Sequence, residues 1–329
     1  MEKLDVICLG ELLIDFVSLD RDSSIAESNG FKKAPGGAPA NVAVGVSRLG
    51  LYSGFIGKVG NDPFGEYLTN VLIDMQVDTK FLVKDDISRT TLSFVAQKSN
   101  GVRDCMFYRN PGADMLLRPD ELEASYFEGA SVFHFGSISL GAEPSKSATL
   151  YAIQCAKENG LLISYDPNLR LSLWSSDDKA RKEILEAFHY ADIVKISDEE
   201  YPFILGVQTP EECADRILSM GPRLVVVTLG PKGCYYSDGK NGGYLPTFDD
   251  VKVVETTGAG DAFVAGMLFG IIARLKDNDL NVLSADETFA KILTFSNAAG
   301  SIATTKLGAI PSLPNFQEVM DFLDRHVPE

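Results

Sequence analysis

The sequence lacks several features that would indicate metal chemistry, redox chemistry or secretion. It contains only three histidines, and the spacing of His134, His189 and His326 matches no metal site. Its five cysteines form no C-x-x-C pair and are odd in number, which is typical of reduced thiols in a cytosol. No signal peptide is visible, and no apolar run approaches the ~20 residues of a membrane helix. We therefore expect a cytoplasmic protein without a membrane partner.

Two common nucleotide-binding motifs are also missing. The chain has no G-x-x-x-x-G-K-[ST] loop, and Phe263 stands where a G-x-G-x-x-G motif beginning at Gly258 needs its third glycine. The formal net charge of −16 disfavours nucleic acid as a partner, because such a field repels a phosphate backbone. The same field repels any anionic substrate unless local arginines or a metal ion intervene.

What the sequence does contain is an alternation of strand-like and helix-like segments over 329 residues, 45% of them hydrophobic. The short apolar, β-branched runs are residues Val6–Leu9, Tyr52–Ile56, Val132–Phe135, Leu161–Asp166, Ile193–Ile196 and Leu224–Leu229. The helical patterns are Ala40–Leu49, Pro63–Met75 (with Asp62 as N-cap), Ser145–Asn159, Lys179–Tyr190 and Glu211–Met220. This alternation predicts an α/β fold with a mostly parallel sheet covered on both faces.

Two stretches, Ile14–Leu19 and Leu92–Arg109, alternate like strands without helices between them. The second stretch contains a hairpin turn at Asn100-Gly101, and another turn of this kind stands at Asn241-Gly242-Gly243. We expect a small β-rich flap that is built from about residues 14–34 and 90–112 and projects from the main sheet.

The segment from Val253 to Phe263 carries the strongest functional signal. A β-like run ends in Gly258, Ala259 and Gly260, which open a helix, and Asp261 follows in its first turn. Small residues let an anion approach the unpaired N–H groups at a helix N-terminus, where the dipole also favours negative charge. Asp261 could take a proton from an attacking hydroxyl, as phosphoryl transfer to an alcohol requires. Taken alone, the segment is better explained as a glycine-rich turn whose aspartate favours the helix dipole.

Two segments near the N-terminus could bind a polyol. Gly36 and Gly37 precede a helix and allow a ligand close to the backbone, and Asn41 near the helix start offers both a donor and an acceptor. Asp15 follows the first strand in an otherwise apolar run, where its carboxylate could accept two hydroxyl hydrogen bonds. Taken separately, Gly36 and Gly37 could be an ordinary loop, Asn41 a residue of a helix cap and Asp15 an exposed turn aspartate.

In their order along the chain, these motifs resemble those of the ribokinase-like carbohydrate kinase family. The resemblance covers nearly the whole chain, and its motifs are Gly10-Glu11 with Asp15, Gly36-Gly37 with Asn41, Gly57-x-x-Gly60-x-Asp62-x-x-Gly65, Asp166-Pro167-Asn168-x-Arg170 and Thr256 to Asp261. The stretches 36–41 and 107–114 look most like those of fructokinases. The resemblance implies a single domain over residues 1–329: a three-layer α/β/α fold with a mostly parallel central sheet and a small β-sheet lid.

The resemblance also implies roles for individual residues. Asp261 is the implied catalytic base, with the N–H groups of Gly258, Ala259 and Gly260 as the anion hole. The implied sugar-binding residues are Asp15, Gly36, Gly37, Asn41, Arg109 and Arg170, with the two arginines reaching either the sugar or the transferring phosphoryl. The implied ATP-binding residues are Lys195, Thr228, Gly230, Gly233 and Asn297.

Two positions depart from the family pattern. Ser197 replaces the asparagine of the usual Asn-x-x-Glu motif, so that Glu200 is expected to reach Mg²⁺ through a water molecule. Glu255 replaces a common aspartate at a monovalent-cation site, where the resemblance implies possible K⁺ binding. The residues implied at that site are Glu255, Thr257, Ala303, Gly308 and Ser312.

The implied activity is ATP-dependent phosphorylation of fructose to fructose 6-phosphate, in a homodimer joined through the lid. Two alternatives stay open at this point. The same chemistry could act on 2-keto-3-deoxygluconate, ribose or a nucleoside, because Arg109 and Arg170 could bind a carboxylate. The chain could also be a sugar-binding regulator without catalysis, although its intact Gly258, Gly260 and Asp261 argue against this.

Overall fold

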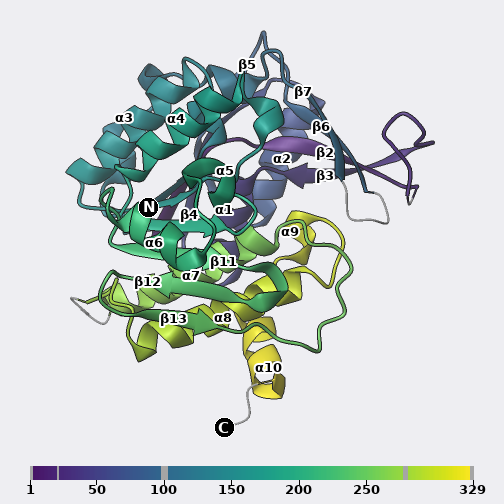
Figure 1. Ribbon diagram of the computed structural model, residues 1–329. Coiled ribbons are helices and arrows are strands. Elements are labelled where there is room, and N and C mark those ends of the chain that lie inside the picture. The colour runs from purple at the N-terminus through teal and green to yellow at the C-terminus, as the bar shows by residue number, and fades with distance from the viewer. Residues whose placement is uncertain (1–2, 21, 98–102, 277–280, 327–329) are drawn as a thin grey trace.

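The computed structural model describes residues 3–20, 22–97, 103–276 and 281–326, and its helices cover both faces of one large sheet (Figure 1). The sheet has nine strands in the order β13-β12-β11-β10-β9-β8-β1-β4-β5. Seven of them run parallel: β1 (Val6–Leu9), β4 (Ser53–Gly60), β5 (Asp78–Asp85), β8 (Val132–Gly136), β9 (Leu162–Asp166), β10 (Ile193–Ser197) and β11 (Leu224–Thr228). The antiparallel strands β12 (Cys234–Ser237) and β13 (Gly242–Leu245) complete one edge.

The two helical layers bury opposite faces of this sheet. In the central strand β1, Val6 and Cys8 pack in one core and Ile7 and Leu9 in the other, and all four are fully buried. The first core is closed by α1 (Ala38–Arg48), α2 (Pro63–Asp74), α7 (Ala259–Lys276), α8 (Glu287–Ala303) and α10 (Phe316–His326). The second is closed by α3 (Ser145–Glu158), α4 (Asp177–Phe188), α5 (Tyr201–Leu205) and α6 (Pro210–Leu218). The predicted three-layer α/β/α architecture with a mostly parallel sheet is confirmed.

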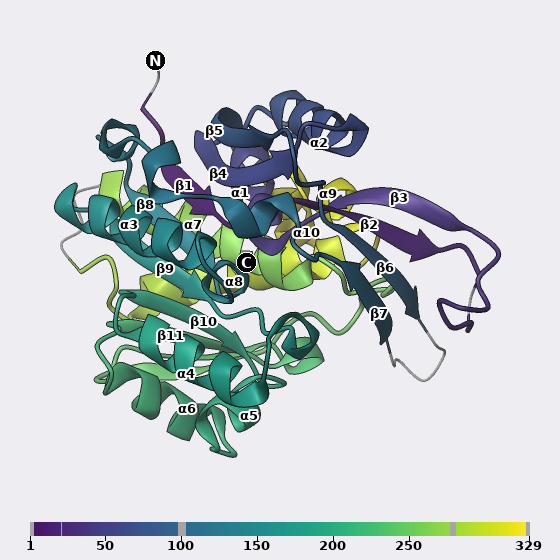
Figure 2. The ribbon, with the colours of Figure 1, turned by 90° about the horizontal axis from the view of Figure 1, so that it is seen from above.

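A second sheet, which we call the small sheet, has four strands in the order β3-β2-β6-β7. Its strands are β2 (Leu13–Ser18), β3 (Phe31–Gly36), β6 (Leu92–Gln97) and β7 (Arg103–Tyr108). Strands β2 and β6 pair in parallel, which sets Asp15 beside Ser93. The small sheet extends from one side of the molecule, within the stretches expected to form a flap (Figure 2). The predicted turn at Asn100-Gly101 lies outside the described residues.

The carboxyl ends of the parallel strands meet at one edge of the main sheet, where ligands of open α/β folds bind. The loops after β1, β8, β9 and β10 gather there, next to the small sheet and the start of α7. The short helix α9 (Ala309–Ser312) packs behind that start. Among the described helices, none combines the length and apolar character needed to cross a bilayer.

The carboxylate of Asp62 links helix α2 to the segment that leads into β6 of the small sheet. Asp62 caps α2 as predicted, accepting hydrogen bonds from the N–H groups of Phe64 (3.0 Å) and Gly65 (2.9 Å). It also accepts from the backbone N–H and the hydroxyl of Thr90, both at 2.9 Å, two residues before β6 begins. Although partial burial opposes the change, these bonds together lower the pKa of Asp62.

We predict that Asp62→Ala lowers the free energy of unfolding by about 2 kcal/mol, since a lost N-cap alone costs roughly 0.5–2 kcal/mol. The stabilisation is present above the pKa of an unfolded aspartate and is lost as pH falls through the lower folded value. Urea unfolding at pH 7 measures it. The control is Asp120→Ala, which breaks an exposed pair with Arg118 and should lower the free energy of unfolding clearly less, because exposed ion pairs contribute little. Equal losses in the two variants would contradict the linking role of Asp62.

Candidate active site

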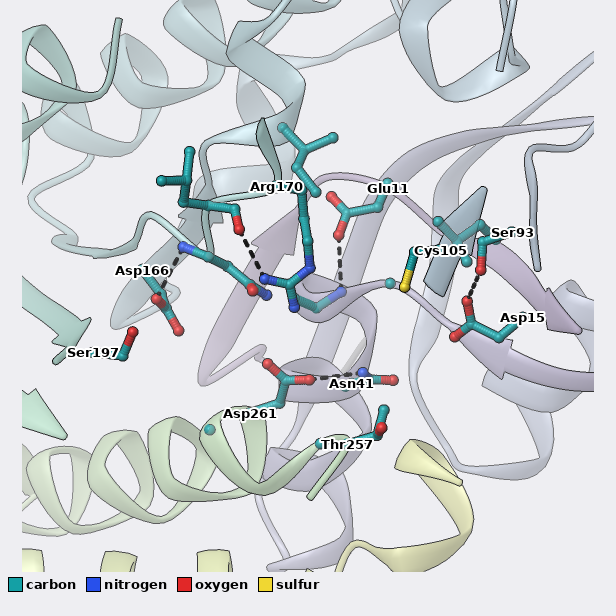
Figure 3. A pocket seen from close by; sticks show the side chains of 18 of the residues that line it. Glu11, Asp15, Asn41, Ser93, Cys105, Asp166, Arg170, Ser197, Thr257 and Asp261 are labelled. Atoms are coloured by element: carbon teal, nitrogen blue, oxygen red, sulfur yellow. Dashed lines mark hydrogen bonds between the residues drawn. The ribbon is translucent and has the colours of Figure 1, made fainter. Parts of the chain in front are cut away.

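A cavity of about 550 Å³ lies where the sheet edge, the small sheet and the start of α7 meet (Figure 3). Its lining comes from segments far apart in the chain. The small sheet contributes Asp15, Ser93 and Cys105, strands β9 and β10 with the loops after them contribute Asp166, Arg170, Lys195 and Glu200, and the start of α7 contributes Gly258, Gly260 and Asp261. The cavity therefore brings most of the predicted site residues to one place.

The turn that opens α7 depends on Gly258. Its φ of +84° lies in the left-handed region, and a Cβ there would come within 2.9 Å of the Ala309 Cα. Gly258 and Gly260 both line the cavity. Ala259 is not among the lining residues, and its N–H donates to the Thr256 carbonyl at 3.3 Å. The structure thus presents Gly258 and Gly260 to the cavity, whereas the N–H of Ala259 has a partner within the turn.

Asp261 is buried at the cavity wall with 8% of its surface exposed. Its carboxylate accepts a 2.7 Å hydrogen bond from the side-chain amide of Asn41 on α1, 220 residues earlier in the chain (Figure 3). Burial raises the pKa of Asp261, while the Asn41 bond and the charges of Lys195 and Arg170 oppose this rise. Such a carboxylate is a stronger base than an exposed one, which suits proton abstraction near neutral pH.

Asn41 is itself incompletely bonded. Its Nδ2 donates to Asp261, but its Oδ1 is buried without a hydrogen-bond partner among the described residues. Asn41 lines the cavity, and a buried acceptor without a partner is costly unless a ligand or water satisfies it. This oxygen is therefore suited to accept a hydrogen bond from a substrate hydroxyl next to Asp261.

Lys195 on β10 is a buried cation next to the start of α7. Its Nζ forms an ion pair with Asp166 at 3.0 Å and lies 3.2 Å from the position that a Cβ on Gly260 would take. Burial works to lower the pKa of Lys195, but Asp166, Glu200 and Asp261 together raise it above the usual value. The ammonium is therefore charged at neutral pH and is available to an anion bound at the helix start.

Glu200 holds the loops after β9 and β10 together. One oxygen accepts from the Leu169 N–H at 2.6 Å, and the other accepts from the N–H and hydroxyl of Ser197 at 2.8 and 2.7 Å. Within the described ranges, no cluster of three or more His, Cys, Asp or Glu side chains is arranged to hold a metal ion. A hydrated Mg²⁺ nevertheless fits, because this ion keeps several waters and commonly uses one carboxylate plus substrate phosphates.

The side of the cavity next to the small sheet contains two further carboxylates. Asp15 on β2 accepts a short hydrogen bond from the Ser93 hydroxyl on β6. Glu11, after β1, accepts from the Ala38 N–H at 2.9 Å. Gly37, with a φ of +115°, lines the cavity between them, and a Cβ there would approach the Glu11 carbonyl oxygen to 2.2 Å. Gly36 lies behind Gly37, outside the lining.

The two predicted arginines differ in position. Arg170 lines the cavity and is exposed, with its guanidinium bonded to the Leu169 carbonyl at 2.9 Å. Arg109 is buried outside the lining, and two of its nitrogens contact Asp114 at 2.7 and 2.6 Å. The structure therefore places Arg109 outside the cavity lining, with its guanidinium paired to Asp114.

The predicted nucleotide residues gather in a second neighbourhood outside the cavity lining. Thr228 at the end of β11 pairs with Cys234, and Gly230 and Gly233 form the turn between them. Asn297 on α8 contacts the Cys234 sulfur at 3.9 Å and donates to the Pro246 carbonyl at 3.2 Å. The end of β11 and helix α8, which are 60 to 70 residues apart in sequence, thus come together around Cys234.

The predicted monovalent-cation residues also lie near one another. Glu255 accepts from the Gly308 N–H at 2.8 Å, and its own N–H donates to Thr304 at 3.1 Å, just after Ala303. Ser312 donates to the Ala309 carbonyl, and Ala309 packs against Gly258. Thr257 lines the cavity. Glu255 therefore fastens the α8–α9 loop to the segment that leads into α7.

Among the lining residues to which the sequence alone assigned no role are Glu11, Ser93 and Asp166. Two of them stand inside quoted motifs, so that a signal for Glu11 and Asp166 was present. Ser93 could have been found only by knowing that β6 pairs with β2 in parallel, because this pairing is not local.

Comparison with known proteins shows which family the chain is similar to. The family model "pfkB family carbohydrate kinase" matches residues 3–315. The chain is 49% identical to "Probable fructokinase-2" of Arabidopsis thaliana over 97% of this chain and 95% of that protein. Among solved structures it is similar to a fructokinase from Xylella fastidiosa with bound ATP, with 30% identity, a TM-score of 0.88, and 97% and 98% of the two chains covered.

A second solved structure is a double-mutant fructokinase from Vibrio cholerae in a form with fructose, ADP and a potassium ion bound. It is 35% identical, with a TM-score of 0.84, and the match covers 98% of this chain and 100% of that one. Because the match of sequence and fold extends over nearly the whole length, the chain belongs to the pfkB family of carbohydrate kinases.

Proposed function

We propose that this protein is an ATP-dependent fructokinase that transfers the γ-phosphoryl group to the primary hydroxyl of fructose and releases fructose 6-phosphate and ADP. The observation that carries the proposal is the buried Asp261 carboxylate at the start of α7, held by Asn41 on one wall of the cavity. The fructokinases among its relatives support fructose as the acceptor and ATP as the donor.

In the proposed mechanism, Asp261 accepts the proton of the fructose hydroxyl as that oxygen attacks phosphorus. The free Oδ1 of Asn41 accepts a hydrogen bond from the sugar, and its Nδ2 keeps the Asp261 carboxylate aimed at the cavity. General-base help of this kind is worth about 10²–10⁴-fold in rate. The proton then resides on Asp261 until the product leaves and the carboxyl returns it to solvent.

The charge of the migrating phosphoryl is met at the start of α7. Gly258 and Gly260 admit an anion close to the helix dipole, and positive charge is supplied by Lys195 beside Gly260 and by Arg170, which also lines the cavity. Since Lys195 is already paired with Asp166, its ammonium is ordered before the phosphate arrives. We assign Ala259 a supporting place in this anion hole, because its N–H already has a partner in the turn.

The small sheet is proposed to act as a lid of one single domain that spans residues 1–329. Asp15, Ser93 and Cys105 face the cavity from this sheet, so that closure would cover the sugar and exclude water that could otherwise hydrolyse ATP. The sugar contacts proposed are Asp15, Gly36, Gly37, Asn41 and Arg170. Arg109 is proposed to support the lid through Asp114.

ATP is proposed to bind along Thr228, Gly230, Gly233 and Asn297, with its phosphates toward Lys195. Mg²⁺ would be held by the ATP phosphates and, through water, by Glu200, where it supplies Lewis-acid stabilisation of phosphate charge. For K⁺ we propose Glu255, Thr257, Ala303, Gly308 and Ser312; the Glu255 carboxylate already binds this loop and would contribute an oxygen.

We further propose a cytoplasmic homodimer. Cys8, Cys155, Cys213 and Cys234 are buried free thiols, which is typical of a reducing compartment. On the face of β7 opposite the cavity, Met106 and Tyr108 expose 48% and 56% of their surface, and Phe94 beside them stacks on Phe16. An exposed apolar sheet face of this kind favours pairing with a second copy through the lid.

A panel of acceptors tests the proposed substrate. Because Arg109 is paired with Asp114, the cavity lacks one of the two cations that could have received a sugar carboxylate. We predict that fructose gives at least a tenfold higher kcat/KM than ribose, 2-keto-3-deoxygluconate or a nucleoside in a coupled assay of ADP release. A sugar acid or nucleoside with the highest kcat/KM would show that fructose is the wrong substrate.

The pH dependence of turnover tests the partnership between Asn41 and Asp261. Since a general base must be deprotonated, kcat/KM should rise with pH through the pKa of Asp261. Asn41→Ala removes a bond that lowers this pKa, so the rise should move to higher pH. The matched control is Asn61→Ala, which removes a surface bond to Asp86 and should leave the rise in place. If kcat/KM rises at the same pH in Asn41→Ala as in wild type, the assigned contact between Asn41 and Asp261 is wrong.

A further inference from the structure

The antiparallel strands β6 and β7 of the small sheet extend together from the main body (Figure 2). We call the two segments that lead into β6 and out of β7, residues 89–91 and 109–114, the base of these strands. One backbone hydrogen bond joins the two segments directly, from the Ala113 N–H to the Arg89 carbonyl at 2.9 Å. The orientation of β6 and β7 relative to the main body therefore depends on what holds this base together.

The carboxylate of Asp114 binds both segments of the base. Its side chain is 2% exposed, and one of its oxygens contacts Nε and Nη2 of Arg109 at 2.7 and 2.6 Å. The other oxygen accepts a hydrogen bond from the Thr91 hydroxyl at 2.5 Å, while the Thr91 carbonyl accepts from Ile14 of β2 at 3.1 Å. A buried ion pair adds little net stability compared with apolar residues of similar volume, but its bonds are directional. These contacts are therefore suited to fix an orientation.

We call Thr91, Arg109 and Asp114 the clamp. All three lie outside the cavity lining, but two of them are close in sequence to residues that line it. Ser93 follows Thr91 by two residues, and Phe107 precedes Arg109 by two residues. The Ser93 hydroxyl in turn donates a hydrogen bond to the Asp15 carboxylate on β2. Because each connection is only two residues long, a shift at the clamp is passed on to the cavity wall that the small sheet provides.

We propose that Asp114 is a positioning residue: by binding Thr91 and Arg109 it fixes β6 and β7 over the cavity, so that the phosphoryl group passes to the sugar and not to water. This inference rests on the proposed function and adds to it a residue that controls the choice of acceptor. In the side reaction, a water oxygen attacks phosphorus in place of the sugar oxygen, and ADP, inorganic phosphate and a proton are released. A small sheet that can tilt weakens the sugar contacts and also admits water.

Two substitutions of Thr91 test the clamp without changing a charge. Thr91→Val keeps the shape of the side chain and removes its bond to Asp114, whereas Thr91→Ser keeps the hydroxyl. In Thr91→Val we expect the fructose KM to rise at least fivefold, with kcat for fructose 6-phosphate within threefold of wild type. At saturating fructose and MgATP, the inorganic phosphate released per fructose 6-phosphate should rise at least threefold. Thr91→Ser should return both values to within twofold of wild type.

A second clamp variant is Asp114→Asn, which keeps the size of the side chain and removes the charge that binds Arg109. It should change both values in the same direction and at least as much; if it does not fold, the Thr91 variants decide.

The matched control is Thr149→Val. Thr149 is fully buried on α3, outside the cavity lining, and its hydroxyl donates to the Ser145 carbonyl at 2.8 Å. This change should leave the fructose KM and the phosphate release within twofold of wild type. Thermal midpoints of all variants show whether the folded state is retained.

The outcomes are distinct. A wild-type enzyme that prefers another acceptor to fructose would contradict the proposed function itself. If wild type prefers fructose and both clamp variants keep its KM and its low phosphate release, the role of Asp114 is wrong while the fructokinase proposal stands. A raised KM without extra phosphate release would show that Asp114 does not control the acceptor. Equal changes in Thr149→Val, no recovery in Thr91→Ser, or unfolding of both clamp variants would show a merely structural role and would overturn the inference as well.

Discussion

The site depends on keeping one carboxylate, that of Asp261, buried and aimed at a cavity. Removing a charge from water is costly unless polar partners compensate for it. Here the compensation comes from elements far apart in sequence: the Asn41 amide from α1, the Lys195 ammonium from β10 and the start of α7 itself. Because each partner is fixed by the packing of its own element, the fold as a whole determines the basicity of this group.

The same constraint accounts for the small residues around the site. Gly258 has to adopt a left-handed conformation against Ala309, and Gly260 leaves the space into which Lys195 extends. Larger side chains would separate the cation from the helix start. Glu200 and Asp62 also hold segments together, farther from Asp261. Each carboxylate accepts hydrogen bonds from backbone N–H groups of two segments and so fixes the distance between them.

Much of this architecture follows from local sequence. The central parallel strands are continuous apolar runs because both of their faces are buried, so Val6–Leu9 and Leu224–Thr228 were recognisable, and Asp62 followed by Pro63 predicted the start of α2 correctly. The edge strand β5 was not predicted, because its partly exposed sequence Asp78–Asp85 shows no such run. Motif order predicted that Asp15, Asn41 and Asp261 would meet, and all three line the cavity.

Local sequence could not predict which charged group a long side chain would bind. Arg109 was expected at the substrate, but a buried arginine binds the nearest well-placed carboxylate, and Asp114 follows five residues later. The position of Glu11 likewise depends on the fold, which sets its carboxyl at the cavity next to the start of α1. Pairings of this kind are decided by tertiary packing and by burial of charge.

The most direct test of the account is the turnover of Asp261→Asn with fructose and MgATP, compared with its affinity for fructose measured by calorimetry. The substitution keeps the shape of the side chain and removes its ability to accept a proton. The account predicts a fall in kcat of about 10²–10⁴-fold with fructose affinity nearly unchanged. A kcat within threefold of the wild-type value would contradict the role of Asp261 as the base.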